Sequence, residues 1–183
     1  MNILTAGPTT ASAIGPQLPR AAEVVRAFTA SPDDDLHPVL AVAAAALAIE
    51  HRLRVGVDAI VGDPRADDPV VAAAARTVCA RDAACAVLID RIDRWAAIEF
   101  AESRAGVLHT ESFGQLIERM VTVWMRGQEL ADSRVAASDP RVRLASAQLG
   151  ELGTAYDDLV TDLRHGRRRL PTLQTPTGPD RTV

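Results

Sequence analysis

The sequence predicts an all-α fold, an antiparallel bundle of four long helices that follows a short N-terminal helix. Apolar residues recur every three or four positions in four long segments, and Pro or Gly marks the ends of those segments. No stretch alternates with period two for long enough to predict a strand. The chain has 183 residues, of which 48% are hydrophobic and 24% charged, and this suits one globular domain. We expect the bundle at 19–170, a flexible arm at 1–18 and a flexible tail at 171–183.

The first helix is predicted at about residues 20–30, and the second from near Asp35 to a stop at 62–64. Pro38 lies in the first turn of the second helix, where proline is tolerated. Apolar residues of this helix alternate between spacings of three and four without a break, so we predict that they form its buried face. They are Val39, Val42, Ala46, Ile49, Leu53, Gly56 and Ile60.

The third helix is expected to begin after Asp68 and to reach about Glu102. Arg81 and Asp82 interrupt its apolar stripe, and such a pair, if buried, needs partners from another helix. The predicted buried residues of the stripe are Val71, Ala75, Val78, Cys85, Ile89, Ile92, Trp95 and Ala96. Cys79 and Cys85 point to different sides of the helix, so we interpret both as core residues and not as a disulfide or metal pair.

The fourth helix is predicted to begin at a capping box formed by Ser112 and Gln115. Its apolar face is wider than a single seam, so the helix is either central or faces a second subunit, and we expect a homodimer. The fifth helix is predicted to open at 138–140 and to end at Gly166. Its seam is Val142, Ala145, Leu149, Leu152, Tyr156, Leu159 and Leu163.

Composition excludes several classes of function. The formal net charge is -4 and aromatic residues make up 3%, so no nucleic-acid partner is expected. All 20 basic residues are Arg. Without Lys the chain cannot form a lysine Schiff base, hold pyridoxal phosphate covalently or complete a phosphate-binding loop. No apolar run approaches the length of a membrane span and no signal-peptide pattern is evident, so we expect a cytoplasmic protein without membrane contact.

The strongest candidate for chemistry is the junction at 109–112, where a loop is predicted to become the fourth helix. Backbone N–H groups and the helix dipole favour an anion at such a position. We expect His109 to transfer protons, Glu111 to orient it or act as a base, and Ser112 to contact the substrate. The competing interpretation is plain capping, in which Glu111 and Ser112 only stabilise the helix N-terminus.

Four residues outside this junction complete the candidate site. Arg119 and Arg126 belong to a polar stripe on the fourth helix, and a guanidinium there can hold a carboxylate or phosphate. The competing interpretation is that this polar stripe is simply the face of the helix that contacts solvent. On the second helix, His51 is a second candidate for proton transfer and Glu50 a candidate substrate contact. Glu50 is also spaced for an ion pair with Arg54, and a lone histidine is commonly structural.

Motifs of metal and cofactor enzymes are missing from the sequence. It contains no HExxH, ExxH, GxSxG or GxGxxG pattern, so we expect no metal and no cofactor. A metal-dependent hydrolase is a further alternative, but it would need at least three converging His or carboxylate ligands.

Several segments resemble the domain of unknown function 4254 family over about residues 36–171. They are His37-Pro38, Glu50-His51, His109-Thr110-Glu111-Ser112-x-Gly114, Ile117-Glu118-Arg119-Met120, Tyr156-Asp157-Asp158-Leu159 and Gly166-Arg167-Arg168-Arg169-Leu170-Pro171. Ser112, Phe113 and Glu118 stand where the family commonly has Thr, Pro and Asp, and Arg52 stands where an acidic residue is expected. The resemblance implies an all-helical bacterial protein and no settled activity.

Two functional hypotheses remain open. In the first, the protein is a cofactor-independent acid–base enzyme that cyclises, isomerises or eliminates a small polar or anionic substrate in a bacterial biosynthetic pathway. Arg119 and Arg126 would hold the substrate, and His109 or His51 would move a proton. In the second, the protein is a non-catalytic binding or assembly protein. It would dock a partner enzyme through the fourth helix and the basic end of the fifth, at 164–169.

Overall fold

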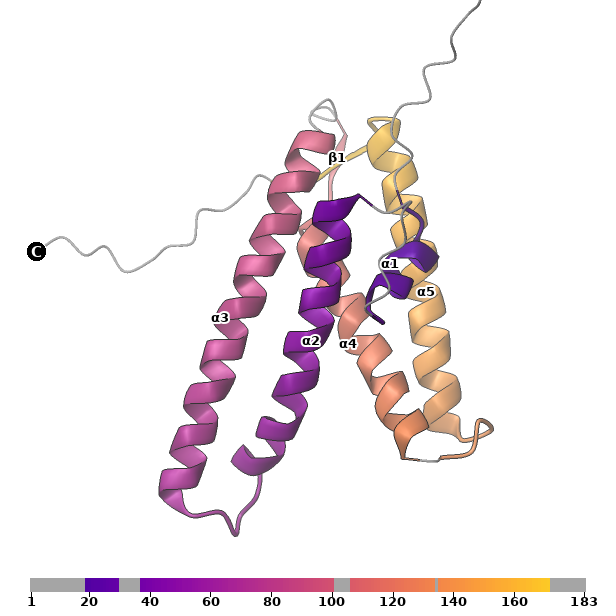
Figure 1. Cartoon of the computed structure of the whole chain (residues 1–183). Coiled ribbons are helices and arrows are strands. Elements are labelled where there is room, and N and C mark those ends of the chain that lie inside the picture. Colours follow the sequence, from indigo (N-terminus) through magenta and orange to yellow (C-terminus); the bar gives the residue numbers. More distant parts are fainter. Residues whose placement is uncertain (1–18, 30–36, 101–105, 134, 172–183) are drawn as a thin grey trace, which may run out of the picture.

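The computed structural model describes residues 19–29, 37–100, 106–133 and 135–171, and it confirms the predicted all-helical bundle (Figure 1). The helices and strands are α1 (Ala21–Ala27), α2 (Pro38–Val61), α3 (Asp68–Glu99), β1 (Val107–Leu108), α4 (Phe113–Asp132), α5 (Pro140–Arg164) and β2 (Arg168–Arg169). The predicted arm at 1–18 and nearly all of the predicted tail lie outside the described residues. Among the described helices, none combines the length and apolar character needed to cross a bilayer.

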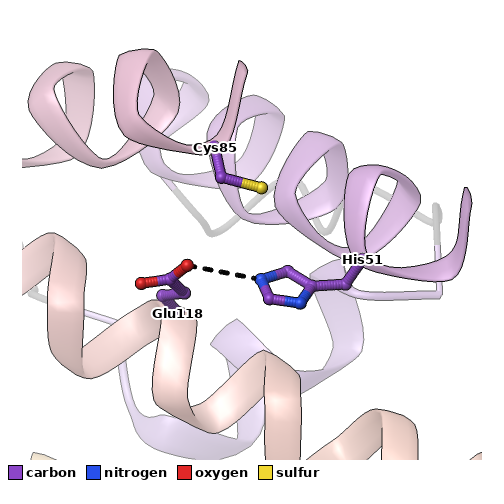
Figure 2. A group of neighbouring side chains, drawn as sticks. All are labelled: His51, Cys85 and Glu118. Atoms are coloured by element: carbon purple, nitrogen blue, oxygen red, sulfur yellow. Dashed lines mark ion pairs between the residues drawn. The ribbon is translucent and has the colours of Figure 1, made fainter. Parts of the chain in front are cut away.

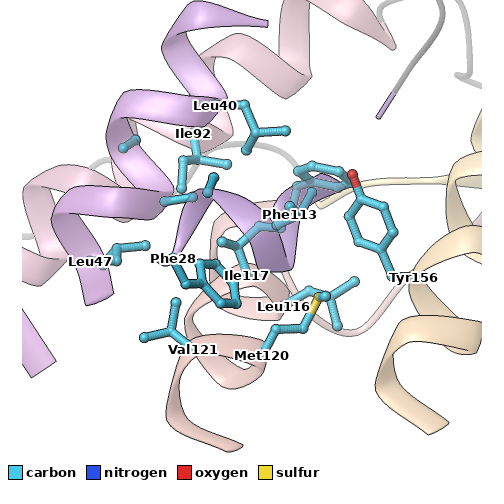
Figure 3. Packing of buried hydrophobic residues seen from close by; sticks show 14 of the residues in the cluster. Phe28, Leu40, Leu47, Ile92, Phe113, Leu116, Ile117, Met120, Val121 and Tyr156 are labelled. Carbon is cyan, nitrogen blue, oxygen red and sulfur yellow. The ribbon is translucent and has the colours of Figure 1, made fainter. Parts of the chain in front are cut away.

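Helix α4 is the centre of the bundle. It packs against α1, α2, α3 and α5, so its wide apolar face is filled within the chain. The side chains of Phe113, Ile117, Met120 and Val121 are fully buried. Figure 3 shows Phe113 and Ile117 between residues of α2 and α3 on one side and Tyr156 of α5 on the other. This arrangement selects the central position that the sequence left open for the fourth helix.

The predicted buried face of α2 is wrong. Val42, Ile49, Leu53 and Ile60 are between 39% and 54% exposed. The buried residues are instead Leu40, Ala41, Ala43, Ala44, Leu47 and Ala48. Because the first half of α2 is rich in alanine, it has two apolar faces, and the small side chains allow close approach to α3 and α4. Periodicity alone does not distinguish these two faces.

The predicted buried faces of α3 and α5 hold in part. Cys85, Ile92, Trp95 and Ala96 of α3 are buried, as are Ala145, Tyr156, Leu159 and Leu163 of α5. Ala75 of α3 is exposed, so its prediction as a buried residue is wrong, and the other residues of the two predicted stripes are half-buried. Cys79 is exposed, so its prediction as a core residue is wrong.

The predicted ends of α4 and α5 are confirmed. Ser112 Oγ accepts from the Gln115 N–H at 3.2 Å, and Gln115 Oε1 accepts from the Ser112 N–H at 2.9 Å. At the end of α5, Gly166 adopts a φ of 67°. Its N–H donates to the Leu163 carbonyl at 3.1 Å, while the Arg167 N–H donates to the Asp162 carbonyl at 2.9 Å. This is the Schellman pattern of a helix that ends at a glycine.

Two short parallel strands, β1 before α4 and β2 after α5, pair with each other. The sequence did not predict these strands. The Val107 N–H donates to the Arg167 carbonyl at 2.9 Å, and the His109 N–H donates to the Arg169 carbonyl at 2.8 Å. A Cβ atom on Gly106 would lie 2.6 Å from the backbone of Arg168, so the two segments can approach this closely only at a glycine. With two residues each, the strands are too short to leave a periodic pattern.

The first turn of α4 lies directly against α3. A Cβ atom on Gly114 would lie 2.6 Å from the Ile89 carbonyl oxygen. The Gly114 N–H donates to Asp93 Oδ1 at 2.6 Å, so a carboxylate of α3 caps α4 across the interface. The close contact therefore fixes the start of α4, where the candidate site begins.

We expect Gly114→Ala to lower the free energy of unfolding by about 1–3 kcal/mol, because the added methyl group overlaps backbone that cannot move aside easily. Urea unfolding followed by circular dichroism measures the change. Gly127→Ala on the same helix is the matched control: nothing lies within 4 Å of its Cβ position, so this variant should be stabilised by up to about 1 kcal/mol. Equal effects of the two substitutions would contradict the close contact.

Candidate functional site

The predicted site residues divide into two groups in the structure. His109, Glu111, Ser112 and Arg119 lie around the first turns of α4. His51 lies farther along the bundle and faces Glu118, on a different side of α4 from Arg119. The two predicted histidines therefore belong to separate sites.

His109 is held by the backbone of Glu111. Its Nδ1 atom lies 2.9 Å from the Glu111 carbonyl oxygen, to which it donates when protonated. In the other neutral tautomer, Nδ1 accepts from the Glu111 N–H at 3.3 Å. The tautomer with the proton on Nδ1 leaves the lone pair on Nε2, which is the arrangement of a general base.

Positive charge surrounds the imidazole of His109. Its pKa is lowered below 6.5, first by burial and then by the charges of Arg168 and Arg119. Arg119 also forms an ion pair with Glu111. His109 is therefore neutral at pH 7, beside guanidinium groups that favour an anion. Both arginines are exposed and can be reached from solvent.

Asp93 of α3 contacts the first turn of α4 at this site. The sequence analysis did not identify this residue. Its carboxylate accepts the Gly114 N–H and interacts with the Ser112 hydroxyl. Burial raises the pKa of Asp93 above 3.8, and these hydrogen bonds partly oppose that shift. The Ser112 hydroxyl is thus used in two contacts at the start of α4, one with Asp93 and one with the Gln115 N–H. The signal was an acidic residue next to the buried Ile92 in the apolar stripe of α3.

Glu50 lies at an ionic contact between α2 and α3. Its Oε2 atom accepts from Arg81 at 2.9 Å, whereas Arg54 pairs with Asp82 at 2.5 Å and Asp58 at 3.2 Å. The predicted Glu50–Arg54 pair is therefore wrong, because both side chains reach across to α3. Arg81 and Asp82 both pair with residues of α2, although neither is buried, so the condition under which partners were expected is not met.

His51, Cys85 and Glu118 form a second polar group, one residue from each of three helices (Figure 2). His51 Nε2 lies 3.5 Å from Glu118 Oε1, and one donor atom from each residue lies within 4.8 Å of the other two. Burial, together with the charges of Glu118 and Glu50, raises the pKa of the Cys85 thiol to about 11. Sequence reasoning missed this group because none of the three residues shares a local motif with another.

Arg126 lies away from both groups. It lines an open groove of about 360 Å³ between the last turns of α4 and the first turns of α5, together with Glu129, Arg141, Leu144 and Gln148. Arg126 is seven residues beyond Arg119 on the helix, which places them about 10 Å apart along its axis. The structure therefore does not bring Arg126 to His109.

We expect the titration midpoint of His109 to lie below 6.5 and to rise in Arg119→Gln, because that change removes a positive charge and frees Glu111. NMR of the histidine ring as a function of pH measures the midpoint. By linkage, the unfolding free energy should fall as pH drops through 6.5, since the unfolded chain binds the proton more readily. Arg126→Gln is the control and should leave the midpoint unchanged; a rise of equal size there would contradict the local assignment.

Comparison with known proteins identifies the family and no activity. The sequence model of the family described as Protein of unknown function (DUF4254) matches residues 43–172, most of the described bundle. Searches among curated proteins and solved structures give no significant match. The match spans both polar groups and the segment from His109 to Gly114. The chain is a member of the DUF4254 family.

Proposed function

We propose that the protein is an acid–base enzyme whose proton-transfer group is His109. The observation that carries the proposal is the position of the His109 imidazole: its Nδ1 contacts the backbone of Glu111, and burial and the charges of Arg168 and Arg119 lower its pKa. An imidazole in this state can accept a proton from a carbon or oxygen acid, and the arginines would hold an anionic group of the substrate.

The roles follow from the geometry of the side chains. Arg119 has five N–H donors, so it can keep its contact with Glu111 while it binds a carboxylate or phosphate. Glu111 orients both His109 through its backbone and Arg119 through its carboxylate. Cyclisation, isomerisation and elimination need only such proton transfers, and bacterial biosynthesis of small molecules is the setting that we propose.

We expect the wild-type protein to convert at least one anionic component of a bacterial small-molecule extract, and His109→Gln to convert none. Mass spectrometry of the extract before and after incubation measures the conversion. The control is His165→Gln, an exposed histidine at the end of α5, which should retain full conversion. Conversion by His109→Gln at the wild-type rate would remove His109 from the mechanism.

We also propose that two copies of the chain associate through the exposed face of α2. Val42, Ile49, Leu53 and Ile60 are apolar, exposed and spaced by seven, four and seven residues. At 100° per residue they lie within about 40° of one another around the helix. This spacing is that of a coiled-coil seam, and an identical seam on a second copy would cover it.

We expect the wild-type protein to sediment at twice its chain mass, and Leu53→Asp to shift it to a monomer because a charge would enter the apolar seam. Analytical ultracentrifugation distinguishes the two states. Val55→Asp is the matched control, since Val55 is 43% exposed on the opposite face of the same helix and should leave the dimer intact. A wild-type monomer at high micromolar concentration would reject this interface.

A further inference from the structure

We propose that His51, Cys85 and Glu118 bind one zinc ion and leave a fourth coordination position open. The three residues come from α2, α3 and α4, and their ligand atoms already point toward a common centre (Figure 2). The site is separate from His109 and rests on different observations, so either proposal can fail without the other.

The distances suit a tetrahedral ion. Zinc bonds of about 2.0–2.3 Å to nitrogen, oxygen and sulfur place neighbouring ligands about 3.3–3.6 Å apart. His51 Nε2 and Glu118 Oε1 are 3.5 Å apart, and the ligand atoms of all three residues lie within 4.8 Å of one another. Closing the remaining gap needs the ligand atoms to move by about 1 Å.

His51 Nε2 has an unused lone pair or proton in the described structure. The atom is buried and makes no hydrogen bond, although Glu118 faces it as an ion-pair partner. An unsatisfied buried nitrogen is unfavourable. A metal ion between the imidazole and the carboxylate would satisfy both groups.

The ligand chemistry selects zinc. A thiolate and an imidazole favour zinc over magnesium or calcium, which prefer oxygen ligands. Binding requires that Cys85 lose its thiol proton to solvent as the sulfur–metal bond forms. The carboxylate of Glu118 would offset part of the charge of the ion, and its side chain is 33% exposed, so water can reach the fourth position.

The neighbouring ion pairs fix the ligands in position. Arg81 lies one helical turn before Cys85 and pairs with Glu50, the residue before His51. Arg54, one turn after Glu50, pairs with Asp82. These two contacts set the register of α2 against α3, so that the imidazole and the thiol meet at the same level of the bundle.

The test uses the full chain, stripped of metal with a chelator and titrated with Co²⁺, a spectroscopic substitute for zinc. We expect one Co²⁺ per chain, a thiolate-to-cobalt charge-transfer band in the near ultraviolet and visible bands of a tetrahedral ion. Zinc should displace the cobalt and remove both sets of bands. Cys85→Ser should abolish the charge-transfer band, and His51→Gln and Glu118→Gln should each weaken binding more than about 10-fold.

Cys79→Ser is the matched control, because Cys79 lies on the same helix but is exposed. It should bind Co²⁺ as the wild type does. Circular dichroism identifies any variant that does not fold. If the Cys85 or His51 variant does not fold, the wild-type charge-transfer band and the Glu118→Gln variant, whose side chain is half-exposed, test the zinc site. Absence of a thiolate band in the wild type, or a band that survives in Cys85→Ser and is lost in Cys79→Ser, would overturn the proposal.

Discussion

The contact between the first turn of α4 and the C-terminal third of α3 determines where both polar groups lie. Gly114 allows the helices to meet, and Asp93 caps the backbone of α4 at the same point. From this fixed start, the helical repeat places Glu118 toward α2 and α3 and Arg119 toward solvent. One glycine contact thus sets the geometry of two sites on adjacent residues.

The two sites differ in their electrostatic surroundings. Around His109, arginines disfavour a proton on the imidazole and favour bound anions. Around His51, the carboxylate of Glu118 favours a cation, and the arginines nearby are paired with Glu50 and Asp82. A single small bundle therefore presents one environment that favours anions and another that favours cations, on neighbouring faces of α4.

The sequence predicted the helices and their ends well, because caps and stops are local signals. Ser112 with Gln115 and the left-handed Gly166 are examples in which a few neighbouring residues determine the structure. The buried face of α2 was not predictable, because its alanines allow two apolar faces and the choice depends on α3 and α4. The group of His51, Cys85 and Glu118 was missed for the same reason: its members are distant in sequence and meet only after the helices pack.

The parallel pairing of β1 with β2 has a consequence for synthesis of the chain. The backbone of His109 is hydrogen-bonded to Arg169, and Arg168 contributes to the charge around its imidazole. A ribosome delivers the N-terminal residues first, so α1 to α4 can pack while the partners of His109 are still being made. The His109 site therefore becomes complete only after β2 has been synthesised, whereas all three residues of the His51 group are available once α4 has emerged.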